Sequence, residues 1–558
     1  SFFDPGTLCR DNRLISPLAD AEYQPRRFYY TDAITDHAVK FLADHHRARP
    51  DQPSFLYVAY TAAHWPMHAL EEDVAKYRGK YDAGYEPIRR ARYQRLKQLG
   101  LIKPEWSMSP QWGDWEKVEH KAWEARCMEV YAAMIDRMDQ GIGRIVAELK
   151  REGRLDDTLI LFLQDNGGCQ EPIGREARTA RPDRPTLPPI AADAIRLDVI
   201  PKQNRAGVPT QTGPTNMPGP EDTYIAYGQG WANVSNTPLR EYKHFVHEGG
   251  ISTPLIAHWP RGIARRGQLE HTPGHLIDIM ATCVDLAGAA YPERIDDRAI
   301  KPLAGRSLAP LFSGRPLERE TLYWEHEGNR AVREGRWKLV AKENREWELY
   351  DIDRDRTERH DLVASEPDRV RQMAAKWDSW AQQSNVLPLG GWRAAADATK
   401  PNSKRLFELK GDAALARDDA PQAAGLDMSI DVTLSKSAPT GVLVAHGGVT
   451  HGYSLYLVDS KLHFATRHEG TLTTLSAAQP LPSQAKRIPV VWRASGEVRA
   501  TADGAEMLTG RVPGSLRKNP IDGLTVARDG GDPVGDYPRE SRFTGQIERV
   551  RIELAKPK

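Results

Sequence analysis

The chain has 558 residues and a formal net charge of +1, because 77 lysine and arginine residues are balanced by 76 aspartate and glutamate residues. This balance argues against a nucleic-acid or membrane-surface partner held by bulk electrostatics. No apolar run approaches the length needed to span a bilayer, so no membrane span is expected. A chain this long is expected to form two or more domains.

The first two-thirds of the chain alternates predicted helices with short apolar strands. Helices are predicted at 31–47, within 73–101, and at 123–150, 275–287 and 368–382. Strands are predicted at 54–61, 159–163 and 253–259, followed by a small antiparallel pair at 337–340 and 347–350. This order predicts an α/β fold, a layered sheet with flanking helices.

The helix at 123–150 carries the clearest apolar periodicity. Its stripe of apolar side chains at steps of three and four consists of Met128, Tyr131, Ile135, Met138, Ile142, Ile145 and Leu149. The stripe predicts one core-facing surface, with Gly153 ending the helix. By contrast, residues 169–238 are rich in proline, polar and weakly periodic, which predicts a long loop of functional type.

Composition changes near residue 390, where a segment rich in Gly, Ala, Lys and Pro is predicted to be a linker. Beyond it, short alternating strands separated by turn residues predict an all-β jelly-roll sandwich. The predicted domains are therefore 1–395 and 405–558. The second domain resembles laminin-G or concanavalin-like sandwiches, which often bind carbohydrate, although a structural brace is an equally good interpretation.

A candidate metal site, which we call the Asp165–Asn166 ledge, follows the predicted strand at 159–163. Asp165 and Asn166 come directly after this strand and precede two glycines. We expect the strand to be buried on both faces, which would place the two polar side chains at its carboxyl end, where ligands bind in open α/β sheets. Their hard oxygen atoms suit Ca²⁺ or Mg²⁺. An ordinary Asn-Gly turn explains these residues alone equally well.

His64 and Lys243 also lie in loops next to predicted strands. A divalent cation, an ammonium group and an imidazole together describe a pocket for a tetrahedral oxyanion such as sulfate or phosphate. Taken singly, His64 fits a capping or core histidine, and Lys243 fits a surface lysine. The four cysteines, Cys9, Cys127, Cys169 and Cys283, lack C-x-x-C spacing, which argues against zinc-finger, redox and disulfide-framework classes.

Five motifs in chain order resemble the type I sulfatases of the alkaline-phosphatase-like superfamily, with arylsulfatases as the nearest group. They are Phe55-Leu-Tyr-Val-Ala-Tyr with His64-Trp-Pro, the segment 131–143, Phe162-Leu-Gln-Asp-Asn-Gly, Lys243 with Glu248-Gly-Gly, and His275-Leu-Ile-Asp. The resemblance covers roughly residues 1–390. It implies hydrolysis of a sulfate ester, on a sulfated glycan or small molecule, by a periplasmic or secreted enzyme; the oligomeric state stays open.

The resemblance also implies roles for individual residues. Asp165 and Asn166 would be Ca²⁺ ligands, and Lys243 would contact the sulfate and neutralise its charge. His64 would bind sulfate near the bridging oxygen and assist departure of the alcohol. His68, His244, His247 and His326 have no equally firm correspondence, and for His326 a structural role is favoured over lining the substrate pocket.

Several parts of the family pattern are missing from this sequence. Sulfatases use a formylglycine made from Cys or Ser in C/S-x-P-x-R, and no cysteine or serine here fits that pattern. The paired aspartates that complete the calcium site are also missing, and we expect both upstream of Ser1, so that this chain alone is inactive. Two alternatives stay open: a phosphodiesterase or phosphonate hydrolase of the same superfamily, and a non-catalytic carbohydrate-binding pseudoenzyme.

Overall fold

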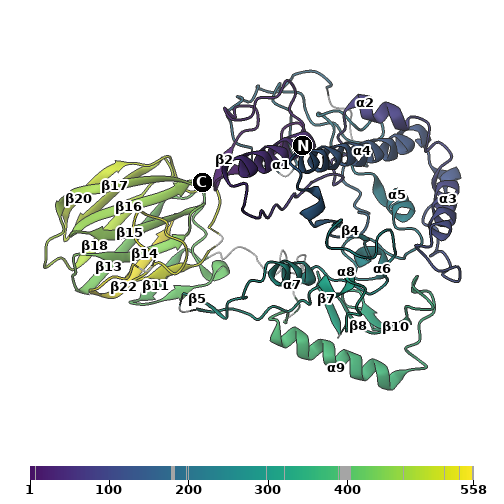
Figure 1. The fold of residues 1–558 in the computed structure, drawn as a ribbon. Helices are drawn as coiled ribbons and strands as arrows, with labels where there is room; N and C mark the ends of the chain where they lie inside the picture. The colour runs from purple at the N-terminus through teal and green to yellow at the C-terminus, as the bar shows by residue number, and fades with distance from the viewer. Residues whose placement is uncertain are drawn as a thin grey trace. The chain divides into compact units, whose positions relative to one another are not determined.

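The computed structural model of the protein describes residues 1–6, 8–176, 182–196, 198, 200–296, 298–319, 321–387, 389, 404–468, 470–520, 522–539 and 541–555. The chain divides into two compact units (Figure 1), which we describe separately. Unit 1 contains residues 1–8 and 15–391, and unit 2 contains residues 9–14 and 392–558. The predicted linker at 390–403 lies outside the described residues.

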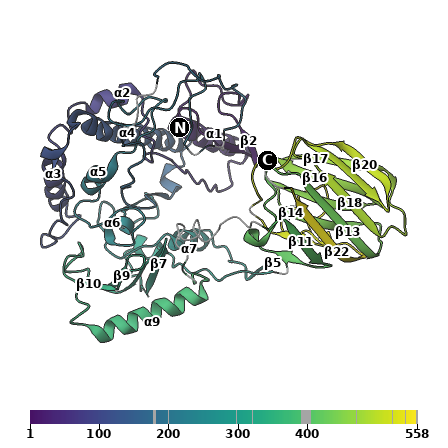
Figure 2. The ribbon, with the colours of Figure 1, turned by 180° about the vertical axis from the view of Figure 1, so that it is seen from behind.

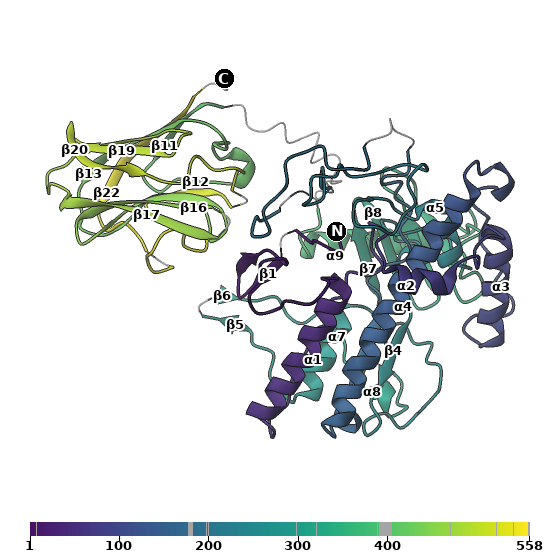
Figure 3. The ribbon, with the colours of Figure 1, turned by 90° about the horizontal axis from the view of Figure 1, so that it is seen from above.

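Two long helices, α1 (Tyr30–Ala48) and α4 (Lys121–Arg151), lie side by side in unit 1 (Figure 3). Their close approach depends on Gly141, since a Cβ atom at this position would lie 2.4 Å from the Thr35 hydroxyl. The other helices of unit 1 are α2 (Glu71–Val74), α3 (Tyr85–Gln98), α5 (Gly228–Ser235), α6 (Glu248–Ile251), α7 (Ile277–Leu286), α8 (Ala309–Phe312) and α9 (Pro367–Gln383). None of the described helices combines the length and apolar character that a membrane-crossing segment needs.

The predicted core stripe of α4 is only partly correct. The most deeply buried side chains include Cys127, Val130 and Met134, whereas Ile135 is 39% exposed. The helix is covered on more than one side, so many of its buried residues lie beside the predicted apolar stripe. Periodicity located the helix but misplaced its core.

The sheet formed by the predicted α/β region is smaller than the layered sheet expected from the sequence, and its topology differs. β3 (Ile160–Leu163) pairs with β4 (Leu255–His258) in an antiparallel two-stranded sheet, and its residues are half-buried, so burial on both faces was a wrong prediction. Residues 54–61 form no strand and join no strand ladder. Phe55 and Tyr57 are 79% and 82% exposed, so the predicted buried strand at 54–61 is also wrong.

A four-stranded antiparallel sheet closes unit 1, in the order β10 (Glu348–Asp351), β9 (Trp337–Ala341), β8 (Asn329–Glu334) and β7 (Leu322–His326). Helix α9 covers one face of it (Figure 2), with Met373 and Trp377 packed against Val332 and Leu339. On the other face, Val246 packs against Tyr350 and its neighbours. This sheet therefore supports the loop that contains Lys243.

Residues 169–238 are less loop-like than predicted. Their second half enters the core, where Ile225 and Trp231 are 0% exposed. The backbone of this segment forms hydrogen bonds with residues far away in the sequence; the Met67 N–H, for example, donates to Ile225 O. Helix α5, which lies within this segment, was not predicted. Tertiary packing, rather than local periodicity, orders this segment.

Unit 2 is an antiparallel sandwich of two six-stranded sheets. One has the order β11 (Leu406–Lys410), β22 (Gln546–Leu554), β13 (Met428–Lys436), β18 (Arg487–Trp492), β19 (Glu497–Ala502), β20 (Ala505–Arg511). The other has the order β12 (Ala414–Leu415), β21 (Leu524–Val526), β14 (Gly441–Gly447), β15 (Gly452–Val458), β16 (Lys461–His468), β17 (Thr471–Pro480). Two short pairs of strands lie outside these sheets. They are β1 (Leu8–Arg10) with β2 (Arg13–Ile15), and, in unit 1, β5 (Arg294–Ile295) with β6 (Arg298–Ala299). The predicted class, α/β followed by an all-β sandwich, is confirmed.

Candidate active site

The turn after β3 and the loop before β4 meet backbone to backbone. The Gly167 N–H donates to Gly250 O at 2.9 Å, and the Lys243 N–H donates to Gly168 O at 3.0 Å. A Cβ atom at Gly167 would lie 1.8 Å from Gly249 O, so only glycine permits this approach. The contact fixes the position of Lys243 relative to the Asp165–Asn166 ledge.

Asn236 joins the same two segments through its side chain. Its Oδ1 accepts from the Gly168 N–H at 2.8 Å, and its Nδ2 donates to Glu241 O at 2.9 Å. The sequence analysis missed this residue, because an isolated asparagine in a proline-rich segment gives no periodic or motif signal. Asn236 therefore positions the site without belonging to its reactive groups.

His64 and Lys243 meet although they are far apart in sequence. Lys243 Nζ lies 3.0 Å from His64 Nε2, and His64 Nδ1 lies 2.9 Å from Trp65 O. Since a carbonyl oxygen can only accept, Nδ1 carries the proton and Nε2 accepts from the ammonium group. The ring of His64 is therefore neutral.

The electrostatic surroundings of His64 agree with a neutral ring. The protein around it displaces water from part of the imidazole and so lowers its pKa, although an edge of the side chain stays exposed. The Lys243 ammonium lowers this pKa further, whereas the Trp65 carbonyl and the carboxylates of Glu171 and Asp165 oppose the shift. The same balance shows that Asp165 lies near enough to His64 to act on its charge.

The Asp165–Asn166 ledge has oxygen atoms available for a cation. Asp165 is exposed, and its carboxylate makes no hydrogen bond or ion pair to any residue that the structure describes. Asn166 uses its Nδ2 to donate to Gly167 O at 3.1 Å, which leaves its Oδ1 as an acceptor. These two hard oxygens fit Ca²⁺, but Ca²⁺ takes about six to eight oxygen ligands, so they supply only part of a site.

Glu171 lies beside this pocket and was not predicted. Its Oε2 accepts from Trp65 Nε1 at 2.7 Å and from the Cys169 thiol at 3.0 Å. Partial burial opposes ionisation of Glu171, but these hydrogen bonds and the nearby cationic groups lower its pKa. Burial and Glu171 raise the pKa of Cys169 to about 12, so this thiol is not an activated nucleophile.

Glu248, from the Lys243 motif, is an anchor rather than a reactive group. Its carboxylate pairs with the fully buried Lys338 of β9 at 2.8 Å, and Lys338 also pairs with Glu358 at 2.9 Å. Arg356 makes a further ion pair to Glu248. The two cations hold the pKa of Glu248 well below its ordinary value despite complete burial. This network ties α6, and hence the Lys243 loop, to the four-stranded sheet.

Three other histidines have structural partners. His68 is buried with Nε2 2.7 Å from Thr223 O, and burial lowers its pKa to about 3. His247 is buried with Nε2 3.4 Å from Glu348, and the His275 backbone N–H donates to Asp278 at 2.8 Å. A cavity of about 640 Å³ in unit 1 is lined by residues such as Phe3 and Arg205, and none of the four predicted site residues lines it.

Comparison with known proteins gives a consistent family assignment. The sulfatase family matches residues 6–289, and the family of N-sulphoglucosamine sulphohydrolase C-terminal regions matches residues 241–379. The chain is 30% identical over 408 residues to an uncharacterized sulfatase of Schizosaccharomyces pombe, covering 69% of this chain and 68% of that protein. It is 30% identical over 293 residues to an arylsulfatase of Klebsiella aerogenes, covering 51% of this chain and 57% of that protein.

Among solved structures, the crystal structure of Ps i-CgsB matches with a TM-score of 0.41 and 21% identity, covering 65% of this chain and 57% of that one. This overall likeness is weak, and the assignment rests on the sequence comparisons. The chain thus spans a little over half the length of the Klebsiella arylsulfatase and about two-thirds of the yeast sulfatase. The protein belongs to the sulfatase family.

Proposed function

We propose that this protein hydrolyses sulfate esters. The observation that carries the proposal is the 3.0 Å approach of Lys243 Nζ to His64 Nε2 beside the free carboxylate of Asp165. Each group lies in a loop held by backbone contacts, so an arriving oxyanion meets the Lys243 ammonium and the His64 imidazole in fixed positions. Membership of the sulfatase family supports sulfate as that oxyanion.

Lys243 and His64 have distinct tasks in this proposal. Lys243 offsets the negative charge of the sulfate group, which is most valuable as charge builds up on the departing oxygen. His64 is neutral before substrate binds. When substrate binds, the Nε2 of His64 contacts the substrate in place of Lys243. The negative charge of a bound sulfate favours protonation of this ring, which would let His64 donate to the leaving alcohol oxygen.

Asp165 and Asn166 would hold Ca²⁺ as two of its ligands in this proposal. Bound there, the ion would supply Lewis-acid stabilisation of the sulfate oxygens. In this proposal the nucleophile is a formylglycine, and neither it nor the remaining calcium ligands are placed among these 558 residues. The absence of C/S-x-P-x-R and the raised pKa of Cys169 support this placement, because they leave no activated thiol next to Lys243 among the described residues.

The substrate class that we propose is a sulfated carbohydrate, with small sulfate esters as assay substrates. The match of residues 241–379 to the N-sulphoglucosamine sulphohydrolase C-terminal family supports this class. We place the catalytic domain at 1–395 and a second domain at 405–558 that either binds carbohydrate or braces the first. A periplasmic or secreted location follows from such a substrate.

The test is turnover by a longer form of the protein that carries a C/S-x-P-x-R segment. An aryl sulfate should be hydrolysed faster than an aryl phosphate diester if the pocket binds a sulfate monoester as proposed. Preference for the diester would favour a phosphodiesterase instead. Binding of sulfated glycans without any turnover would favour a non-catalytic binding protein. The 558-residue chain alone should turn over an aryl sulfate poorly or not at all, and strong turnover would contradict the placement of the nucleophile.

Lys243→Ala in that extended protein should lower turnover severely, since it removes the charge that stabilises the transition state. The matched control is Lys376→Ala, because Lys376 is an exposed lysine of α9 paired with Glu334. Turnover of the control should match that of the unaltered protein. A loss below about threefold for Lys243→Ala, roughly 0.65 kcal/mol, would argue against its assigned role.

A further inference from the structure

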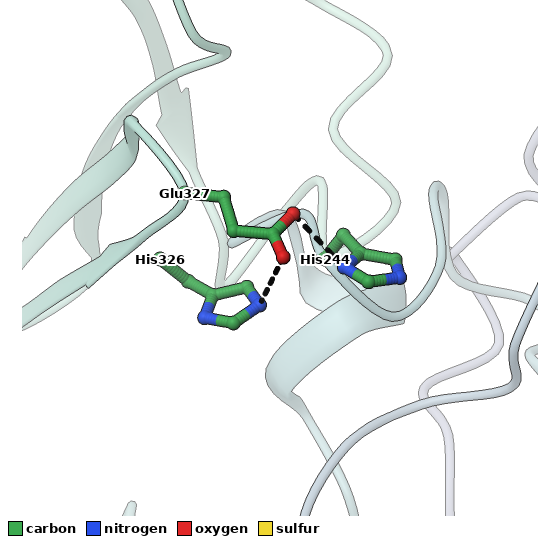
Figure 4. A group of neighbouring side chains, drawn as sticks. All are labelled: His244, His326 and Glu327. Atoms are coloured by element: carbon green, nitrogen blue, oxygen red, sulfur yellow. Dashed lines mark ion pairs between the residues drawn. The ribbon is translucent and has the colours of Figure 1, made fainter. Parts of the chain in front are cut away.

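A cluster of two histidines and a glutamate lies next to the candidate site and has no part in the proposed hydrolysis. His244 follows Lys243 in the loop before α6, whereas His326 and Glu327 lie at the tip of the β7–β8 hairpin (Figure 4). One candidate ligand atom from each of the three side chains lies within 4.8 Å of the other two. Within the described residues, no other group of three His, Cys, Asp or Glu side chains is arranged in this way.

The Glu327 carboxylate lies between the two imidazoles. His244 Nδ1 is 3.0 Å from Glu327 Oε2, and His326 Nε2 is 3.6 Å from Glu327 Oε1. The rings of His244 and His326 are stacked at 22° with centroids 5.8 Å apart. Two ring nitrogens and a carboxylate oxygen therefore converge on one small volume.

The side chain of Asn329 and a tight hairpin turn hold the segments of the two histidines in place. Asn329, which is 5% exposed, donates from its Nδ2 to His244 O at 2.9 Å and to His326 O at 3.0 Å. Glu327 and Gly328 form the two-residue hairpin turn, with φ values of +52° and +82°, as a type I′ turn requires. One buried amide thus fixes both histidine segments relative to each other.

The surroundings of His244 resemble the outer shell of a metal site. A histidine that ligates a metal through one ring nitrogen commonly directs the other nitrogen to a carboxylate. Here His244 Nδ1 faces the cluster, and its Nε2 lies 3.7 Å from Glu171 Oε1. Glu171 is itself fixed by the Trp65 indole and the Cys169 thiol. An ion pair between Glu327 and a histidine would need no such second carboxylate.

We propose that His244 Nδ1, His326 Nε2 and Glu327 form a Zn²⁺ site. Imidazole and carboxylate ligands suit Zn²⁺, which binds them at about 2.0 to 2.2 Å and often uses three protein ligands plus water. The three ligand atoms, which lie within 4.8 Å of one another, would have to converge to that distance from a common centre. The side chain of His326 is 55% exposed, which gives the ion a path in and leaves a position for water.

Zinc titration of the full 558-residue chain tests this site. Chelator-treated protein is titrated with Zn²⁺ against a chromophoric zinc indicator near neutral pH, with excess Ca²⁺ to occupy oxygen-only sites. His326→Ala and Glu327→Gln should each weaken one Zn²⁺ equivalent by more than about tenfold, since even loss of an outer partner costs about that much. Unchanged zinc affinity and stoichiometry in both variants would overturn the proposal.

The control variant is His360→Ala, because His360 is an exposed histidine paired with Asp355 at a separate place in unit 1. It should bind zinc like the unaltered chain, and an equal loss in this control would also overturn the proposal. Co²⁺ in place of Zn²⁺ should give the visible absorption of a four-coordinate site, and this band should disappear in Glu327→Gln. Glutamine at position 327 keeps the size of the native side chain, and a matching circular dichroism spectrum verifies the fold.

Discussion

At the scale of single residues, the site combines reactive groups that the sequence identifies with positioning groups that it does not. His64, Lys243, Asp165 and Asn166 could be singled out because they lie next to apolar runs and in recognisable motifs. Asn236 and Glu171 could not, because their effect depends on partners remote in sequence or on side-chain direction. The tautomer of His64 likewise depends on the Trp65 carbonyl, which only three-dimensional geometry reveals.

A titration of His64 tests the electrostatics of the pocket. Its pKa should lie below the ordinary value of 6.5, since desolvation and the Lys243 ammonium both favour the neutral ring. In Lys243→Ala the pKa should rise, because a neighbouring positive charge is removed and water gains access. Proton NMR of the ring in both proteins gives the two values. A pKa that falls or does not move in the variant would contradict the 3.0 Å contact.

At the scale of elements, the Lys243 loop depends on a buried ion network in the four-stranded sheet. Glu248 of α6 and Glu358 share the ammonium of Lys338, which is 0% exposed. The sequence predicted β9 and β10 as a pair but could not show that a strand lysine faces inward. The buried Lys338 is paired with two carboxylates from other segments of the chain, and such a pairing depends on the tertiary structure.

Lys338→Met should destabilise unit 1 by roughly 3 to 5 kcal/mol, because it leaves the buried Glu358 without its cation and Glu248 with Arg356 alone. Lys376→Met is the matched control, since Lys376 is exposed and its loss should cost at most about 1 kcal/mol. Urea unfolding of both variants measures the difference. Similar midpoints for the two variants would show that the network contributes little.

At the scale of the whole molecule, the sequence predicted the fold class and most elements but not the packing of unit 1. The sandwich strands alternate cleanly, so the sequence predicted short strands within residues 405–558, where β11 to β22 lie. In unit 1, the apolar run at 54–61 predicts a buried strand, although it pairs with no strand that the structure describes. An apolar run shows only that a segment can be buried, because its partner strands decide whether it is.

The stability of the sandwich should depend on pH through His446 of β14. Burial lowers the pKa of His446 to about 4, below its ordinary value of 6.5. Between these two values the unfolded state binds more protons, so stability is full above about pH 6.5 and falls as the pH drops towards 4, by up to about 1.4 kcal/mol per pH unit. His446→Gln should flatten this dependence in urea unfolding measured near pH 7 and near pH 5. An equally steep dependence in the variant would assign it to other groups.

The backbone contact at Gly167 also bears on the chemical ageing of the protein. Asn166–Gly167 is the dipeptide that deamidates most readily in flexible chains, because the glycine nitrogen attacks the asparagine side-chain carbonyl to close a succinimide. Here the Gly167 N–H is donated to Gly250 O at 2.9 Å, and Asn166 Nδ2 is held on Gly167 O at 3.1 Å. Both the attacking nitrogen and the side-chain amide group that would leave are engaged in hydrogen bonds, so folding protects the side-chain amide of Asn166 from deamidation. Peptide mapping after storage should find deamidation at Asn166 chiefly in unfolded protein.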